Sequence, residues 1–106
     1  MSEVLVAGAD GEGVAEALRS RGVSVTEIDG TETKAELEAV GVASADALVV
    51  TEAHLATVVA VAVDINPDLR IVFYTRDSVP EFIKGQAGHI LDPKLFDPDA
   101  VAEELD

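Results

Sequence analysis

The sequence predicts an α/β domain in which helices cover both faces of a parallel sheet. Short apolar runs of strand length alternate along the chain with segments of helical periodicity. The apolar runs are nearly continuous, which is typical of parallel strands that are buried on both faces. Glycine and proline punctuate these segments and no long linker separates them. We therefore expect one domain over residues 1–106.

The first half of the chain contains two predicted strand–helix pairs. The apolar run over 4–8, "VLVAG", indicates the first strand, and a helical pattern over 14–18 continues until Gly22 ends it. The β-branched run over 23–28, "VSVTEI", indicates the second strand. A capping-box pattern within 31–41 predicts the second helix, which a glycine closes.

The middle of the chain adds two strands and a helix. The runs over 45–50, "ADALVV", and 71–74, "IVFY", predict the third and fourth strands. Between them, residues 53–65 are apolar over an arc too wide for a surface helix. We therefore expect this helix to be largely covered.

The C-terminal quarter predicts three short elements. These are a helix over 80–84, a fifth strand over 89–91, and a last helix with Asp97 as its N-cap and Pro98 at its first position. We expect three apolar side chains to pack these segments onto the sheet: Phe82, Leu95 and Phe96.

The order of the strands follows from the handedness of their connections. Right-handed crossovers around a central first strand predict the order 2-1-3-4-5, a Rossmann-like three-layer sandwich. In such sheets, ligands lie at the carboxyl ends of the strands, beside the point where the order reverses. This rim should gather the following residues: Gly8 to Gly13, Asp29, Thr51, Thr75 and Asp92.

The charge of the chain excludes several classes of partner. There are 21 Asp and Glu residues against 7 Lys and Arg, for a net charge of −14. Nucleic acid and anionic membranes repel such a surface. We interpret the acidity as that of a salt-adapted, halophilic surface and assign it no function. No apolar run is long enough to span a bilayer and no targeting peptide precedes the first strand, so we expect a soluble cytoplasmic protein.

The sequence gives little support for an enzyme or a metal site. It has no cysteine and no serine in a nucleophile-elbow pattern. Glu52 and His54 are two neighbouring residues without further ligands, so we interpret them as solvated loop residues. His89 is expected to be a packed or edge-strand residue. We therefore predict a non-enzymatic protein without catalytic or metal-binding residues.

A glycine loop follows the first strand. A dinucleotide-binding loop needs a glycine for the tight turn, a second where backbone approaches the pyrophosphate, and a third for close helix packing. Gly8 and Gly13 occupy the outer positions, and Asp10 replaces the middle glycine. Asp29 follows at the spacing expected of an acid that accepts ribose hydroxyls.

These segments resemble the TrkA-N or RCK N-terminal domains of potassium-transport regulators. The resemblance runs through "VLVAGADGEGVAEALRSRGVSVTEID", "AVGVASADALVV", "INPDLRIVFYT" and "GQAGHILDP", nearly the whole chain. It implies a regulatory domain that binds NAD(H) or another adenine nucleotide, forms homodimers, and acts in trans on a membrane-transport or other protein partner. The residues that it assigns to the nucleotide site are Gly8, Asp10, Gly11, Gly13, Asp29 and Thr51.

Two departures from that family leave the ligand open. A strand that the family places before the "GVASADALVV" segment is missing, and it forms part of the adenine pocket. Asp10 brings a negative charge to the position where bare backbone should meet pyrophosphate, and like charges are costly to bring together. The alternatives are a small nucleotide sensor and an interaction module that has lost its ligand.

The chain also resembles response-regulator receiver domains. These share the predicted strand order, carry Thr or Ser where Thr75 stands, and have a "K-P-F" turn that "DPKLFDPDAV" partly matches through Lys94. However, Thr51 stands where a receiver carries its phosphorylated aspartate, and Asp10 lacks an adjacent acid for magnesium. This resemblance implies a degenerate receiver-like interaction module that is not phosphorylated.

Overall fold

In the computed structural model, residues 3–75 and 89–105 are described, and their five strands form one parallel sheet. The order is β2-β1-β3-β4-β5, as predicted from the sequence. The strands are β1 (Glu3–Ala7), β2 (Ser24–Ile28), β3 (Ala47–Val50), β4 (Arg70–Tyr74) and β5 (His89–Leu91). Among the described residues, β2 is an edge strand with no further strand beside it.

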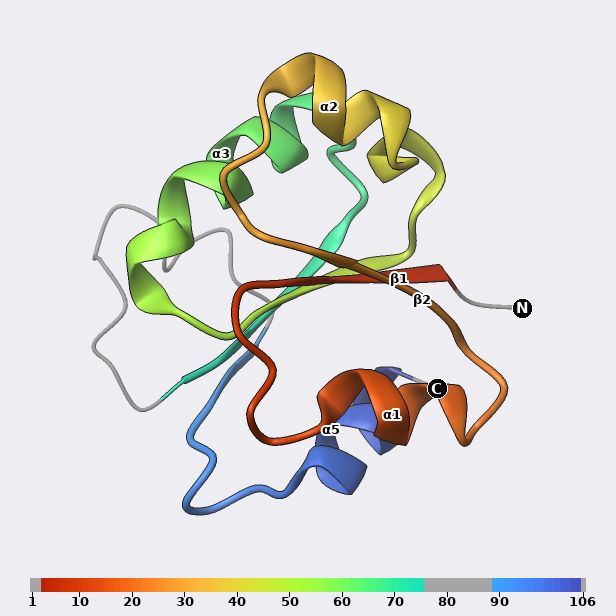
Figure 1. Ribbon diagram of the computed structural model, residues 1–106, viewed down its shortest axis with the longest axis vertical. Coiled ribbons are helices and arrows are strands. Elements are labelled where there is room, and N and C mark those ends of the chain that lie inside the picture. The colour runs from red at the N-terminus through yellow and green to blue at the C-terminus, as the bar shows by residue number, and fades with distance from the viewer. Residues whose placement is uncertain (1–2, 76–88, 106) are drawn as a thin grey trace.

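Helices cover both faces of this sheet (Figure 1). On one face lie α1 (Val14–Arg19) and α5 (Pro98–Leu105), and on the other lie α2 (Lys34–Ala39) and α3 (Ala56–Ile65). Two 3-10 turns, η1 (Val42–Ser44) and η2 (Ala53–Leu55), flank β3. The predicted Rossmann-like three-layer sandwich is therefore confirmed.

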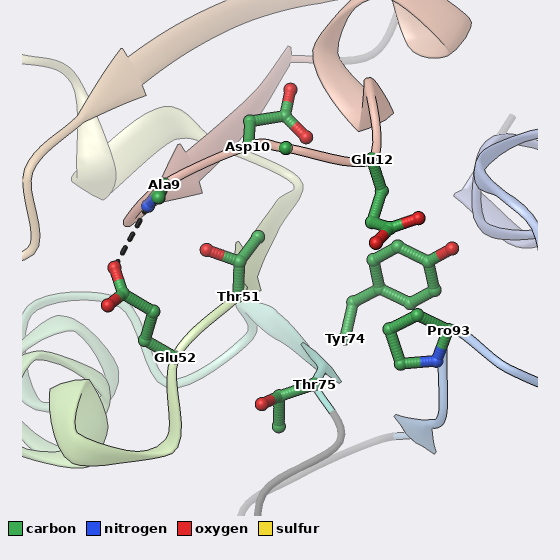
Figure 2. A pocket seen from close by; sticks show the side chains of 9 residues that line it. Ala9, Asp10, Glu12, Thr51, Glu52, Tyr74, Thr75 and Pro93 are labelled. Carbon is green, nitrogen blue, oxygen red and sulfur yellow. Dashed lines mark hydrogen bonds between the residues drawn. The ribbon is translucent and has the colours of Figure 1, made fainter.

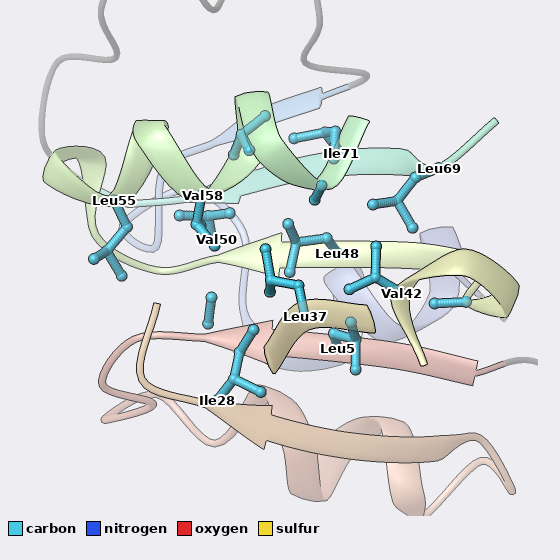
Figure 3. Packing of buried hydrophobic residues seen from close by; sticks show 14 of the residues in the cluster. Leu5, Ile28, Leu37, Val42, Leu48, Val50, Leu55, Val58, Leu69 and Ile71 are labelled. Atoms are coloured by element: carbon cyan, nitrogen blue, oxygen red, sulfur yellow. The ribbon is translucent and has the colours of Figure 1, made fainter. Parts of the chain in front are cut away.

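The central strands divide their side chains between two hydrophobic cores. Leu5 and Leu48 point to the core beneath α2 and α3, which Figure 3 shows, whereas Val6 and Val49 point to the core beneath α1 and α5. All four side chains are buried, and each such burial contributes about 1.5–3 kcal/mol. Because helices cover both faces of the sheet, the sequences of β1 and β3 are nearly continuous apolar runs.

Side-chain caps fix the starts of two helices, as predicted. The Thr33 hydroxyl accepts a hydrogen bond from the Glu36 N–H at 3.2 Å, and the Glu36 carboxylate accepts one from the Thr33 N–H at 3.0 Å. Before α5, the Asp97 carboxylate accepts from the Ala100 N–H at 2.9 Å. These caps satisfy N–H groups that the helices leave without internal partners.

The prediction that the third helix is largely covered is wrong in part. Val58, Val59 and Ala62 are buried in α3, but Thr57 and Ala60 are exposed. The first residues of the predicted helix form the 3-10 turn η2 instead. The apolar composition of the segment predicted burial around most of the helix. Alanine side chains are small, however, so α3 can leave part of its surface in solvent.

The expectation that Leu95 and Phe96 pack onto the sheet is also wrong. Leu95 is 78% exposed and Phe96 is 41% exposed. Both lie in the turn between β5 and α5, whose backbone is held by hydrogen bonds to Asp92 and to the buried Tyr74, while the two side chains stay exposed. The predicted helix over 80–84, with Phe82, lies outside the described residues.

Within residues 3–75 and 89–105, no helix is long and apolar enough to cross a membrane. The most apolar of them, α3, has ten residues. A bilayer-spanning helix needs about 20.

Candidate functional site

A pocket of about 300 Å³ opens at the carboxyl ends of β1, β3 and β4 (Figure 2). Its lining residues are Ala9, Asp10, Gly11, Glu12, Thr51, Glu52, Tyr74, Thr75 and Pro93. Three of the residues assigned to the nucleotide site, Asp10, Gly11 and Thr51, are thus brought together. The other three do not line the pocket. The sheet places its pocket where ligands of this fold are expected, beside the reversal of strand order.

Gly8 makes the turn that leads from β1 into the loop. Its φ is +99°, a left-handed conformation, and its N–H donates to the carbonyl of Ile28 at 3.0 Å. A β-carbon here would lie 2.6 Å from Thr51 Oγ1 and 2.8 Å from Glu52 Oε2. Gly8 is therefore required both by its backbone conformation and by the close approach of the next loop.

Gly13 and Gly11 have different surroundings from Gly8. Gly13 has a φ of +83°, but a β-carbon there would meet nothing within 4 Å. The prediction that Gly13 serves close helix packing is therefore wrong, because its left-handed backbone alone favours glycine. A β-carbon at Gly11 would likewise meet nothing within 4 Å.

Asp10 caps the N-terminus of α1 with its own carboxylate. Oδ1 accepts from the Val14 N–H at 2.8 Å, and Oδ2 accepts from the Ala15 N–H at 2.9 Å. Figure 2 shows this side chain pointing away from Thr51 and Thr75. The first N–H groups of a helix are the ones that phosphate binds in dinucleotide and phosphate sites. Here both of these donors are already satisfied by an anion within the chain.

Two further carboxylates satisfy backbone donors along the rim. Glu52 Oε2 accepts from the Ala9 N–H at 2.9 Å (Figure 2). After β2, the Glu32 carboxylate accepts from the N–H groups of Asp29 at 3.1 Å and Gly30 at 2.8 Å. Asp10, Glu32 and Glu52 together thus occupy five N–H donors that face the carboxyl ends of β1 and β2.

The interpretation of Glu52 as a solvated loop residue is wrong, because its carboxylate accepts from the Ala9 N–H. The role of Glu32 was not predicted, although the sequence carries a signal for each residue. Glu52 directly follows Thr51, which was assigned to the rim because it follows the third strand, and the same position after the strand indicates Glu52. Glu32 stands three residues after Asp29, a spacing at which a carboxylate reaches back to a preceding N–H.

Leu55 packs against the turns that follow β1 and β2. Its side chain is buried, and it lies against both glycines that follow β1 and β2. A β-carbon at Gly30 would be 2.5 Å from Leu55 Cδ1, and one at Gly8 would be 3.0 Å from the same atom. The predicted ribose acid, Asp29, is exposed and does not line the pocket.

The threonines at the ends of β3 and β4 do not supply the chemistry of a phosphorylated receiver. The Thr51 hydroxyl donates to the Ala7 carbonyl at 3.2 Å, which ties β3 to β1. Thr75 is buried with 7% of its surface exposed. Thr51 occupies the position at which an acceptor aspartate would stand.

The electrostatics of the pocket oppose phosphate ligands. Asp10, Glu12 and Glu52 line it, and none of the lining residues within 3–75 and 89–105 is Lys or Arg. Phosphate sites combine backbone N–H donors with cationic side chains. In this pocket the carboxylates occupy those donors and add negative charge of their own.

Neither described histidine belongs to a metal site. His54 Nε2 is 3.8 Å from Glu52 Oε1, with a side chain that is 70% exposed. His89 Nε2 is 2.7 Å from Glu104 Oε1, an ion pair when the ring is protonated, and joins β5 to α5. Over residues 3–75 and 89–105, no group of three His, Asp or Glu side chains is arranged to hold a metal ion.

The fold and this rim define a class of protein, the doubly wound α/β domains with strand order 2-1-3-4-5. Within that class, residues 4–105 match the family described as a family of unknown function, DUF7126, and the chain belongs to it. None of the curated proteins compared with the chain matches it.

Three solved structures share this fold with the chain. A response regulator from Burkholderia pseudomallei, crystallised with a phosphorylated aspartic acid, a calcium ion and citrate, superposes with a TM-score of 0.71 at 21% identity. The match covers 100% of this chain and 67% of that one. A protein described as pilus assembly-related, from the same species, gives a TM-score of 0.64 at 18% identity, with coverage of 99% and 87%. A protein described as a pilus assembly protein, from Burkholderia thailandensis, gives the same TM-score and identity, with coverage of 99% and 95%. At these identities the similarity establishes the fold alone.

Proposed function

We propose that the chain is a non-enzymatic, receiver-like protein-interaction domain that works without phosphorylation. The observation that carries this proposal is the occupation of the rim by the chain's own carboxylates. Asp10, Glu32 and Glu52 hold five backbone N–H donors at the rim, among them the two at the start of α1 that a phosphate would bind. A domain of this fold in which these donors are occupied still presents a rigid surface to a partner.

The receiver-like part of the proposal is supported by the structural neighbours. A response regulator and two pilus-assembly-related proteins share the strand order and extend over nearly all of this chain. The non-phosphorylated part rests on Thr51, which replaces the acceptor aspartate and donates its hydroxyl hydrogen to Ala7.

The nucleotide-sensor reading stays a prediction with less support. None of the matches connects the chain with potassium-transport regulators, and Asp29 does not line the pocket. A nucleotide at this rim would have to displace the Asp10 carboxylate from Val14 and Ala15. We therefore assign NAD(H) and other adenine nucleotides no place in the proposed function.

A ligand panel in molar potassium chloride tests this proposal. The unfolding temperature is measured with NAD, NADH or ATP, and with beryllofluoride plus magnesium as a mimic of phosphorylation. We expect no change with any of them, because ligands that bind only the folded state raise its stability. The Asp10→Gly variant is the matched test of the blocked donors.

A rise in unfolding temperature with a nucleotide, larger in Asp10→Gly than in the natural chain, would instead support the nucleotide sensor. A rise with beryllofluoride and magnesium would show that the phosphorylation chemistry is retained. If the chain is an interaction domain, it should form a complex with a partner protein from the source cells. The same complex should form again from the two purified proteins. Failure to recover any such complex would contradict it.

A further inference from the structure

The turn between β5 and α5 presents two neighbouring apolar side chains to solvent. Leu95 is 78% exposed and Phe96 is 41% exposed. A single exposed apolar residue is ordinary on a protein surface, but two adjacent large ones form a small apolar patch. We name Leu95 and Phe96 the apolar pair.

Hydrogen bonds hold the backbone of this turn in one conformation. The Tyr74 hydroxyl, on a side chain buried in the core, donates to the Phe96 carbonyl at 2.7 Å. The Asp92 carbonyl accepts from the N–H groups of Leu95 at 2.9 Å and Phe96 at 3.0 Å, and its carboxylate accepts from the Lys94 N–H at 2.8 Å. The backbone that carries the apolar pair is therefore ordered before any partner arrives, which lowers the entropic cost of binding.

The charges around the apolar pair are mostly negative. Between residues 92 and 99 there are three carboxylates, on Asp92, Asp97 and Asp99, and one cation, Lys94. Pro93 joins this turn to the pocket, where Glu12 and Glu52 add two more carboxylates. The apolar pair thus lies beside an acidic rim, on a chain whose net charge is −14. Interfaces pair a patch of one sign with a patch of the other.

From this arrangement we propose that the apolar pair is a docking surface for a basic, amphipathic segment of a partner protein. Apolar side chains of the partner would pack on Leu95 and Phe96, while its Lys or Arg side chains face the carboxylates of the turn and the rim. A second copy of this chain is the less suitable occupant, because both copies would carry the same negative charge. The inference rests on the proposed interaction function and gives it a surface and a partner chemistry.

A peptide titration tests the docking surface. Two dye-labelled peptides of equal length carry the same leucines at helical spacing, and the remaining positions are lysine in one and glutamate in the other. Fluorescence anisotropy is measured at low salt and in molar potassium chloride. We expect the lysine peptide alone to bind, and the joint substitution Leu95→Ser with Phe96→Ser to weaken its binding at least tenfold.

Ile90→Ser is the matched control, since Ile90 is 45% exposed on β5 and lies outside the turn. It should leave binding unchanged, and thermal melts should show that all variants fold. Equal binding to the natural chain and the doubly substituted chain would overturn the docking surface and leave the interaction function standing. Absence of binding by the lysine peptide would overturn the proposed partner chemistry. Self-association that Leu95→Ser abolishes would assign the surface to a second copy and also contradict the proposal.

Discussion

Asp10, Glu32 and Glu52 each place a carboxylate against backbone N–H groups at the rim of the sheet. A carboxylate at a helix N-terminus satisfies orphan donors and interacts favourably with the helix dipole. Such a cap contributes about 0.5–2 kcal/mol to stability. The negative charge that made Asp10 look unfit for a phosphate loop is therefore a stabilising feature of the loop as it stands.

Alanine substitutions at the three loop glycines distinguish two causes of destabilisation, a left-handed backbone and a close contact of the added β-carbon. Gly8→Ala introduces a left-handed alanine and a β-carbon close to Thr51, so we expect a loss of about 2–4 kcal/mol. Gly13→Ala introduces only the left-handed conformation and should cost about 1–2 kcal/mol. Denaturant unfolding measures both.

Gly11→Ala is the control, because Gly11 has neither a positive φ nor a neighbour within 4 Å of a β-carbon. Its stability should remain within about 0.5 kcal/mol of the natural chain. Equal losses for Gly8→Ala and Gly13→Ala would show that the contact with Thr51 has no energetic weight.

Only the features of the site that depend on neighbouring residues in the sequence could be predicted. Gly8 and Thr51 follow the ends of β1 and β3, as the strand pattern predicts, but only Thr51 lines the pocket. The hydrogen bonds of Asp10 could not be predicted, because a carboxylate in a glycine loop can face either a ligand or its own helix. Leu55 was missed because its contact with Gly8 and Gly30 joins segments that are distant in sequence.

At the scale of elements, the capping box of α2 should make that helix sensitive to acid. Hydrogen bonds with Thr33, first to its backbone N–H and then to its side chain, lower the pKa of Glu36 below its ordinary value of 4.5. A lowered folded-state pKa gives stability that is present above pH 4.5 and is lost as the pH falls through the lower value. The stability difference between the natural chain and Glu36→Gln should therefore shrink on acidification.

Unfolding curves between pH 7 and about pH 3 measure this difference, since unpaired carboxyl groups titrate near pH 4. Glu38→Gln is the control, because Glu38 is exposed on the same helix and does not take part in the capping box. A difference for Glu36→Gln that stays constant with pH would exclude the charged cap as a source of stability.

Arg19 covers part of the open edge of β2. Its guanidinium donates to the Val25 carbonyl at 3.3 Å and pairs with Glu27 at 3.4 Å. Unpaired strand edges invite pairing with other chains, and charged side chains oppose it. We expect Arg19→Ala to cost less than about 1 kcal/mol of stability but to increase self-association, as measured by analytical ultracentrifugation.

Lys34→Ala is the matched control for this prediction, because the Lys34–Asp64 pair is similarly exposed and joins α2 to α3 away from the edge. An increase in association in both variants would point to lost positive charge and not to the edge of β2.

A helix or strand could be predicted where its sequence pattern had a single physical explanation. Continuous apolar runs such as 47–50 are buried on both faces, and the capping box allowed only one start for α2. The failure at Leu95 and Phe96 has a different cause. Apolar character predicts burial, but the Tyr74 hydroxyl fixes the turn with these side chains outward, and that contact spans 22 residues of sequence.

At the scale of the whole molecule, the net charge of −14 should make stability depend on salt. Like charges on a compact surface repel one another, and the screening length falls from about 10 Å at 0.1 M salt to about 3 Å at 1 M. We expect the unfolding temperature to rise steadily between these concentrations of potassium chloride. An unfolding temperature that falls or stays constant would contradict the interpretation of a salt-adapted surface.

The proposed function depends most on the occupation of backbone donors at the carboxyl rim by the chain's own carboxylates. The most direct measurement is amide hydrogen exchange by NMR. We expect the amides of Val14 and Ala15 to be protected in the natural chain and to lose protection in Asp10→Ala, while the Ala9 amide, bonded to Glu52, keeps its protection. Val14 and Ala15 amides that exchange freely in the natural chain, or that are equally protected in Asp10→Ala, would contradict the occupation of these donors by Asp10.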